Sequence, residues 1–131
     1  MKTTTREWVD KAEADYAAAV LLRKSRKKHA RDIVCFHQQQ CVEKYLKARL
    51  EEGTGGAGIA YPRTHDLERL LDLALPVEPL WAMLRPVLIT ITTCAVEIRY
   101  PGRSVTASEA NIFLRDTTHI RHLARRSLGL P

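Results

Sequence analysis

The chain has 131 residues, of which 45% are hydrophobic and 27% are charged, and Lys and Arg exceed Asp and Glu by 21 to 15. This length predicts a single domain, 1–131, that buries about two-thirds of its unfolded surface in one core. No run approaches the roughly 18 apolar residues of a membrane span, and the first residues lack the apolar core of a signal peptide. We therefore expect a cytoplasmic protein with no membrane contact.

A helical hairpin is predicted at the start of the chain. Thr4 and Glu7 have the spacing of a capping box, which predicts a helix from there to about Lys24. Its apolar residues recur at helical spacing: Trp8, Val9, Ala12, Tyr16, Ala19 and Val20. The basic run 23–31 forms the turn into a second helix that begins near His29. Such a short connection predicts an antiparallel pair.

The second helix, centred on 36–50, has apolar residues around much of its circumference, which predicts a position wrapped by neighbours. A polar row at steps of three and four shares one face: His37, Gln40, Lys44, Lys47 and Glu51. One interpretation is a solvated face with an ion pair from Glu43 to Lys47. The other is a polar seam that faces a partner subunit or a ligand. Residue types alone leave both open.

The segment 53–62 contains four glycines and a proline, which predicts a surface loop. It lacks the Gly-Lys-Ser/Thr ending of a phosphate-binding P-loop. Thr64 is a suitable N-cap for a short helix with Asp66 and Glu68 in its first turn, which continues through Leu67 to Leu73 or Ala74. His65 beside Asp66 resembles an acid–base pair, but both residues fit the first turn of this helix structurally.

Two further helices are predicted. One begins at Pro79, is kinked or interrupted at Pro86, and ends before Pro101. The β-branched run 87–93 has strand propensity, but a lone strand has nothing to pair with in this chain. Thr106 and Glu109 form a second capping box, and the last helix carries one apolar face: Ala110, Phe113, Thr117, Ile120 and Ala124.

The sequence contains no convincing catalytic or metal-binding constellation, so we expect no metal and no cofactor. The three cysteines, Cys35, Cys41 and Cys94, fit neither a disulfide framework nor a zinc site and are expected in the core. Basic residues gather in 23–31 and 121–126, where they can contact RNA or an acidic partner or simply be solvated. Arg99 and Tyr100 end a helix, where they either cap it or face a ligand across the loop.

One stretch carries a family resemblance. Phe36-His37-x-Gln39-Gln40-x-x-Glu43-Lys44-x-Leu46-Lys47-Ala48 resembles the second-helix signature of the HEPN family, and Thr64-His65-Asp66-Leu67 and Arg99-Tyr100-Pro101 follow in the family's order. The resemblance implies an all-α, HEPN-like, up-and-down bundle of four to five helices that forms a homodimer.

The resemblance also provides a test for catalysis. HEPN ribonucleases that work without metal carry an Arg followed, after four to six residues, by a His. After Arg99 the corresponding positions are Ser104, Val105 and Thr106. We therefore expect no ribonuclease activity from this motif. The enzyme alternative is an RNase toxin in which Arg115 stabilises an anion and His122 is the general acid or base.

The chain most resembles the branch associated with minimal nucleotidyltransferases. That resemblance implies a protein that binds a nucleotide or substrate and acts as partner of a separately encoded transferase, in a toxin–antitoxin pair. A third alternative is a non-catalytic homodimeric interaction module. We place the expected ligand site at six residues: Lys44, Lys47, Arg99, Tyr100, His37 and Gln40.

Overall fold

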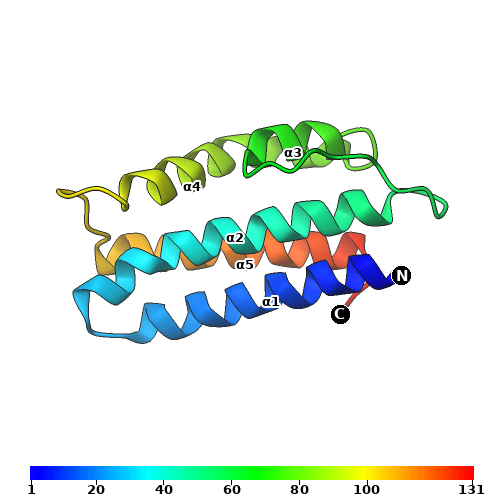
Figure 1. Ribbon diagram of the computed structural model, residues 1–131. Coiled ribbons are helices and arrows are strands. Elements are labelled where there is room, and N and C mark those ends of the chain that lie inside the picture. The colour runs from blue at the N-terminus through cyan, green and yellow to red at the C-terminus, as the bar shows by residue number, and fades with distance from the viewer.

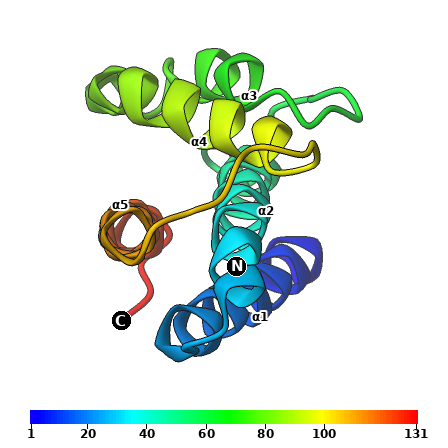
Figure 2. The same cartoon turned by 90° about the vertical axis from the view of Figure 1, so that its left-hand side faces the viewer.

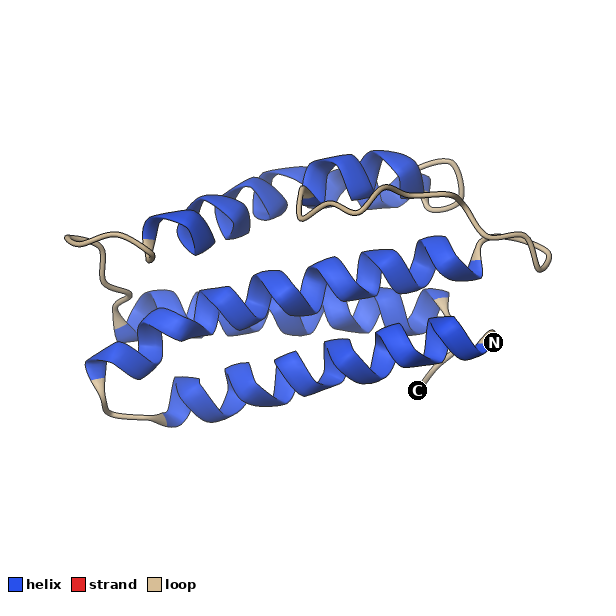
Figure 3. Cartoon of the chain, in the orientation of Figure 1, coloured by secondary structure: helices blue, strands red, loops and turns tan.

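The computed structural model describes all residues, 1–131, and every regular element in it is helical (Figure 3). In chain order the elements are α1 (Thr3–Lys24), α2 (Lys28–Glu52), α3 (Leu67–Ala74), the 3₁₀-helix η1 (Pro79–Leu84), α4 (Arg85–Glu97) and α5 (Ala107–Ser127). The expected all-α bundle of four to five helices is confirmed, with five α-helices.

Helix α2 is the centre of the bundle. It runs antiparallel to α1, and the end-on view shows α1, α5 and the α3–α4 layer arranged around it (Figures 1 and 2). Of its 25 residues, 12 are buried. This confirms the wrapped position that its apolar residues predict.

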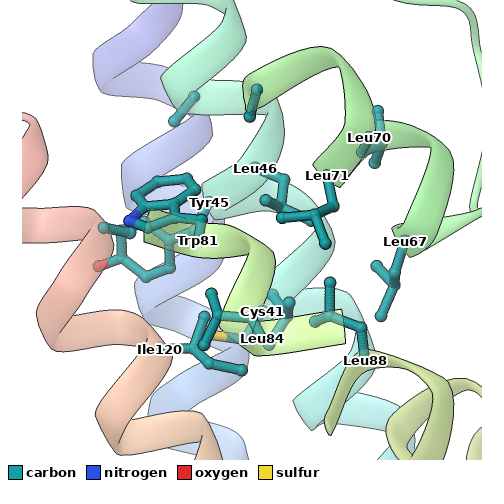
Figure 4. Packing of buried hydrophobic residues seen from close by; sticks show 14 of the residues in the cluster. Cys41, Tyr45, Leu46, Leu67, Leu70, Leu71, Trp81, Leu84, Leu88 and Ile120 are labelled. Carbon is teal, nitrogen blue, oxygen red and sulfur yellow. The ribbon is translucent and has the colours of Figure 1, made fainter. Parts of the chain in front are cut away.

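The main core lies between α2 and the α3–η1–α4 layer. Tyr45 and Leu46 of α2 pack against Leu70 and Leu71 of α3 and against Trp81 of η1 (Figure 4). Each fully buried leucine contributes roughly 1.5–3 kcal/mol relative to an exposed one. A smaller cluster joins α2, α4 and α5 around Cys35, Cys94 and Phe113. The expected burial of all three cysteines is confirmed.

The helix ends show where local signals fail. The Thr106–Glu109 capping box forms as predicted, with both reciprocal hydrogen bonds. The Thr4 prediction is wrong, because α1 begins at Thr3 and its N-cap is Lys2, whose backbone N–H donates to Glu52. Thr64 is not the N-cap of α3 either. Asp66 is the N-cap instead, because its side chain accepts from the backbone N–H of Arg69. At α1 a tertiary hydrogen bond to Glu52, and at α3 this local one, therefore decide where the helix begins.

Pro86 interrupts the fourth helical segment as predicted, and the strand alternative for 87–93 is wrong. The 3₁₀-helix ends at Leu84, and Pro86 lies in the first turn of α4, where its missing N–H needs no partner. Contrary to the expectation from the sequence, Pro79–Glu97 has the length and the mean hydropathy, 1.5, of a membrane span. Leu84, Leu88 and Ile91 of this segment are buried in the bundle, and 33% of its apolar window is buried in all.

Candidate functional site

The polar row of α2 meets two different neighbours. At 3.6 residues per turn the row is about 80° wide, so its two edges point in different directions. His37 and Lys44 lie at one edge and contact α1, whereas Gln40 and Lys47 lie at the other and face the α2–α3 loop and α4. Figure 2 shows α1 and α4 on different sides of α2.

At the α1 edge, Asp15 binds two side chains of the row, His37 and Lys44. Its carboxylate lies 2.8 Å from His37 Nδ1, and it also accepts a hydrogen bond from Lys44 Nζ. Asp15 itself is buried, with 8% of its surface exposed. The charge of Lys44 is therefore matched inside the protein and is directed away from α4.

At the other edge, Glu43 is the centre of a buried polar cluster. Its carboxylate accepts from Lys47 Nζ at 3.1 Å and from the side-chain amide of Gln39 at 3.1 Å, and it lies 2.8 Å from His65 Nδ1. Lys47 also lies over the ring of Trp8, 5.3 Å from its centroid. The Glu43–Lys47 pair predicted for a solvated face is present, but only 3% of Glu43 and 7% of Lys47 are exposed.

Two pockets open on either side of His65. The larger, about 880 Å³, lies between the start of α1, the end of α2 and the loop 58–65, and Lys47 and Trp8 are among its walls. The smaller, about 410 Å³, lies between α2 and α4. Its walls are Phe36, Gln39, Gln40, His65, Thr92, Ala95, Val96 and Arg99. No carboxylate lines this α2–α4 pocket.

Arg99 and Tyr100 follow α4, which ends at Glu97 with Ile98 as its C-cap. Arg99 lines the α2–α4 pocket together with Gln40, and its guanidinium makes no ion pair. Tyr100 is 64% exposed and lines no pocket. Of the six residues expected at the site, the structure thus brings together Gln40 and Arg99. Lys47 is separated from them by His65, and His37 and Lys44 are bound to Asp15.

The residues of the enzyme alternative lie elsewhere. Arg115 and His122 are both exposed on α5, seven positions and therefore about 10 Å apart along the helix. Neither makes a side-chain hydrogen bond or an ion pair. The neighbouring Arg121 and Arg125 are bound to Glu13, so the C-terminal basic cluster is partly neutralised by α1.

His65 is the site residue that sequence reasoning assigned to another role. Its place near the start of α3 is that of a residue in a helix cap, yet its ring contacts Glu43, 22 positions earlier in the chain. Its backbone carbonyl also accepts from the amide of Gln39. No spacing rule links residues this far apart. The only signal was the order of the Glu43-containing stretch and the Thr-His-Asp-Leu stretch along the chain.

The model of the HEPN domain matches residues 5–127, nearly the whole chain. The protein belongs to the HEPN family. No curated protein and no solved structure matches it significantly. Membership of the HEPN family accounts for the all-α bundle built around α2.

Proposed function

We propose that this HEPN protein binds a nucleotide in the α2–α4 pocket, with the phosphate group on Arg99. The observation that supports this proposal is the unpaired Arg99 in a pocket without carboxylates. A guanidinium in this position can hold a phosphate through two parallel hydrogen bonds. The other cations of the expected site, Lys44 and Lys47, are already paired with Asp15 and Glu43.

The rest of the pocket suits a nucleotide chemically. The side-chain amide of Gln40 gives one N–H to Gln39 and keeps a second, which can donate to a phosphate oxygen or to the edge of a base. Both amide protons of Gln39 are already donated, to Glu43 and to the carbonyl of His65. Phe36 is 38% exposed at the same pocket and offers a ring on which a base can stack. A volume of about 410 Å³ lies in the range of small-molecule sites.

We further propose that the nucleotide serves a minimal nucleotidyltransferase, encoded separately, for which this protein is the partner in the cytoplasm, within a toxin–antitoxin pair. The support is the resemblance of the chain to the nucleotidyltransferase-associated branch, together with the α2–α4 pocket proposed above. The neighbouring reading frame tests this partnership. If it encodes such a transferase, the two proteins expressed together should elute as one complex in gel filtration, and separate elution would contradict the pairing.

Nucleotide binding is tested by calorimetric titration of the purified protein with ATP and related nucleotides. We expect micromolar to millimolar affinity that weakens as salt rises. Arg99→Ala should lose about 1–3 kcal/mol of binding free energy, the contribution of a charged hydrogen bond. Arg115→Ala is the matched control, because it removes the same charge from an exposed position on α5 and should leave the affinity unchanged.

Circular dichroism should show the same helix content in both variants. If Arg99→Ala binds the nucleotide as tightly as the wild type, Arg99 does not hold the phosphate group and the proposed phosphate site in the α2–α4 pocket is wrong. Equal losses in Arg99→Ala and Arg115→Ala would indicate attraction by net charge instead of a site.

A further inference from the structure

Two of the three cysteines meet although they are far apart in the chain. Cys35 lies on α2 and Cys94 on α4, 59 positions later, and their sulfur atoms are 2.8 Å apart. Both side chains are buried, with 0% and 3% of the residue exposed. The two thiols therefore face each other across the contact between these helices, with no side chain between them.

The pair lies close to the protein surface. Cys94 lines a small opening of about 270 Å³ between α4 and the start of α5, together with Thr93, Arg103 and Glu109. Arg103 donates from Nη2 to the sulfur of Cys94 at 3.7 Å, and its guanidinium is held by Glu97 and Glu109. A small polar oxidant in this opening can reach Cys94 first.

We propose that Cys35 and Cys94 form a two-thiol modification site, at which hydrogen peroxide produces an intramolecular disulfide between α2 and α4. The Cys94 thiolate attacks one peroxide oxygen, the O–O bond breaks, and the departing oxygen leaves as water after taking up a proton. Cys94 is then a sulfenic acid. The Cys35 sulfur attacks the Cys94 sulfur, the S–O bond breaks, and a second water leaves with the Cys35 proton. The two thiols lose two electrons, which reduce one molecule of hydrogen peroxide.

The surroundings distinguish the roles of the two sulfurs. The hydrogen bond between the two sulfur atoms lowers the pKa of Cys94, and the positive charge of Arg103 lowers it further. The same hydrogen bond, followed by burial, raises the pKa of Cys35. Cys94 therefore ionises first and is the nucleophile toward the peroxide, and Cys35 is the resolving thiol.

The third cysteine provides an internal reference. Cys41 is buried in the main core and no other sulfur contacts it. Burial raises the pKa of its thiol. It should remain reduced under conditions that oxidise the pair.

The bond would also join two walls of the α2–α4 pocket, since Phe36 follows Cys35 and Ala95 follows Cys94 in the chain. Its formation does not depend on nucleotide binding, and the test below involves no nucleotide.

The full-length protein, reduced and freed of reductant, is treated with a small excess of hydrogen peroxide and then unfolded for thiol titration. We expect the number of free thiols to fall from three to one, and the intact mass to fall by two hydrogen atoms. Proteolysis should give one peptide pair, containing Cys35 and Cys94, that separates on reduction. The melting temperature should rise on the order of 10 °C and return with reductant, because the bond closes a long loop.

Cys41→Ser is the matched control and should retain the disulfide, whereas Cys35→Ser should stop at an oxidised Cys94 without a cross-link. If a variant fails to fold, the thiol count, the mass and the peptide pair of the wild-type protein still test the proposal. Three free thiols after peroxide treatment would overturn the proposal. A disulfide that contains Cys41, or one between two chains, would also overturn it.

Discussion

Glu13 on α1 joins three helices through one carboxylate. It accepts from Arg121 Nε and Nη2 at 2.7 and 2.6 Å, and also from the hydroxyl of Tyr45 on α2. The hydrogen bond and charge of Arg121, with Tyr45 and Arg125, hold the pKa of Glu13 below its usual value of 4.5. A carboxyl with a depressed pKa stabilises the fold above the pKa of the unfolded chain, and this stability is lost as pH falls through the folded value.

The prediction at this position concerns the pH dependence of stability. In Glu13→Gln the free energy of unfolding should fall by roughly 1–2 kcal/mol at pH 7, a value reduced for the partial exposure of the pair. The difference between the variant and the wild type should begin to shrink as pH falls below about 4.5, where the carboxyl of the unfolded chain takes up a proton, and should vanish below the lower pKa of Glu13 in the folded state. Urea unfolding at a series of pH values measures both effects.

Glu7→Gln is the matched control for this measurement, since it makes the same change at an exposed position of α1 without an ion pair. It should follow the wild type throughout. A constant difference between Glu13→Gln and the wild type at all pH values would show that ionisation of Glu13 contributes nothing.

At the scale of the element, the two capping-box sequences of the chain have different outcomes. Thr106 begins α5 and accepts from the backbone N–H of Glu109, and the Glu109 side chain accepts in return from the backbone of Thr106. Arg103 adds two hydrogen bonds to the same carboxylate. At the other sequence, Thr4 already lies inside α1, because Lys2 is fixed to the end of α2 by Glu52 and by the carbonyl of Glu51.

Thr106→Ala should therefore lower the free energy of unfolding by about 1 kcal/mol, the usual effect of losing an N-cap. Thr4→Ala provides a matched control in the same sequence pattern, and its exposed hydroxyl caps nothing. We expect a change within about 0.5 kcal/mol there. Chemical denaturation of the two variants measures both free energies of unfolding. If Thr106→Ala and Thr4→Ala lose the same amount, the capping bonds of α5 add no stability.

At the scale of the whole molecule, the elements could be predicted from the sequence better than their contacts. Helical periodicity, prolines and the Thr106 cap are local signals, so the helices and the central place of α2 could be predicted. Asp15 and His65 contact residues of α2 that lie 22 or more positions away in the chain, and helix periodicity gives only the approximate direction of a side chain. For this reason the six expected site residues divide among four surroundings: the contact with Asp15, the Glu43 cluster, the α2–α4 pocket and, for Tyr100, the open surface.

Because periodicity gives only the approximate direction of a side chain, the surface expected to join two copies, the polar row of α2, also needs revision. The polar row of α2 is largely used within the chain, by Asp15 and Glu43. Large apolar side chains of α2 and α4 remain exposed instead: Ile33, Phe36, Ile89 and Val96. Phe36 and Val96 line one pocket, so part of this apolar surface is continuous across the two helices.

We predict a symmetric homodimer that uses Ile33, Ile89 and Val96 of this apolar surface and leaves Phe36 to the α2–α4 pocket, because a two-fold axis places the same patch on both partners and removes it from water. Light scattering at high micromolar concentration should give twice the chain mass of 14.9 kDa. Val96→Glu should shift the protein toward the monomer, since a charge at the interface would be buried without a partner. Leu21→Glu is the control, because Leu21 is 72% exposed on α1, on another side of α2 from α4, and it should leave the mass unchanged (Figure 2). A monomer mass for the wild type would contradict the dimer, and a dimer that both substitutions leave intact would place its interface on another surface.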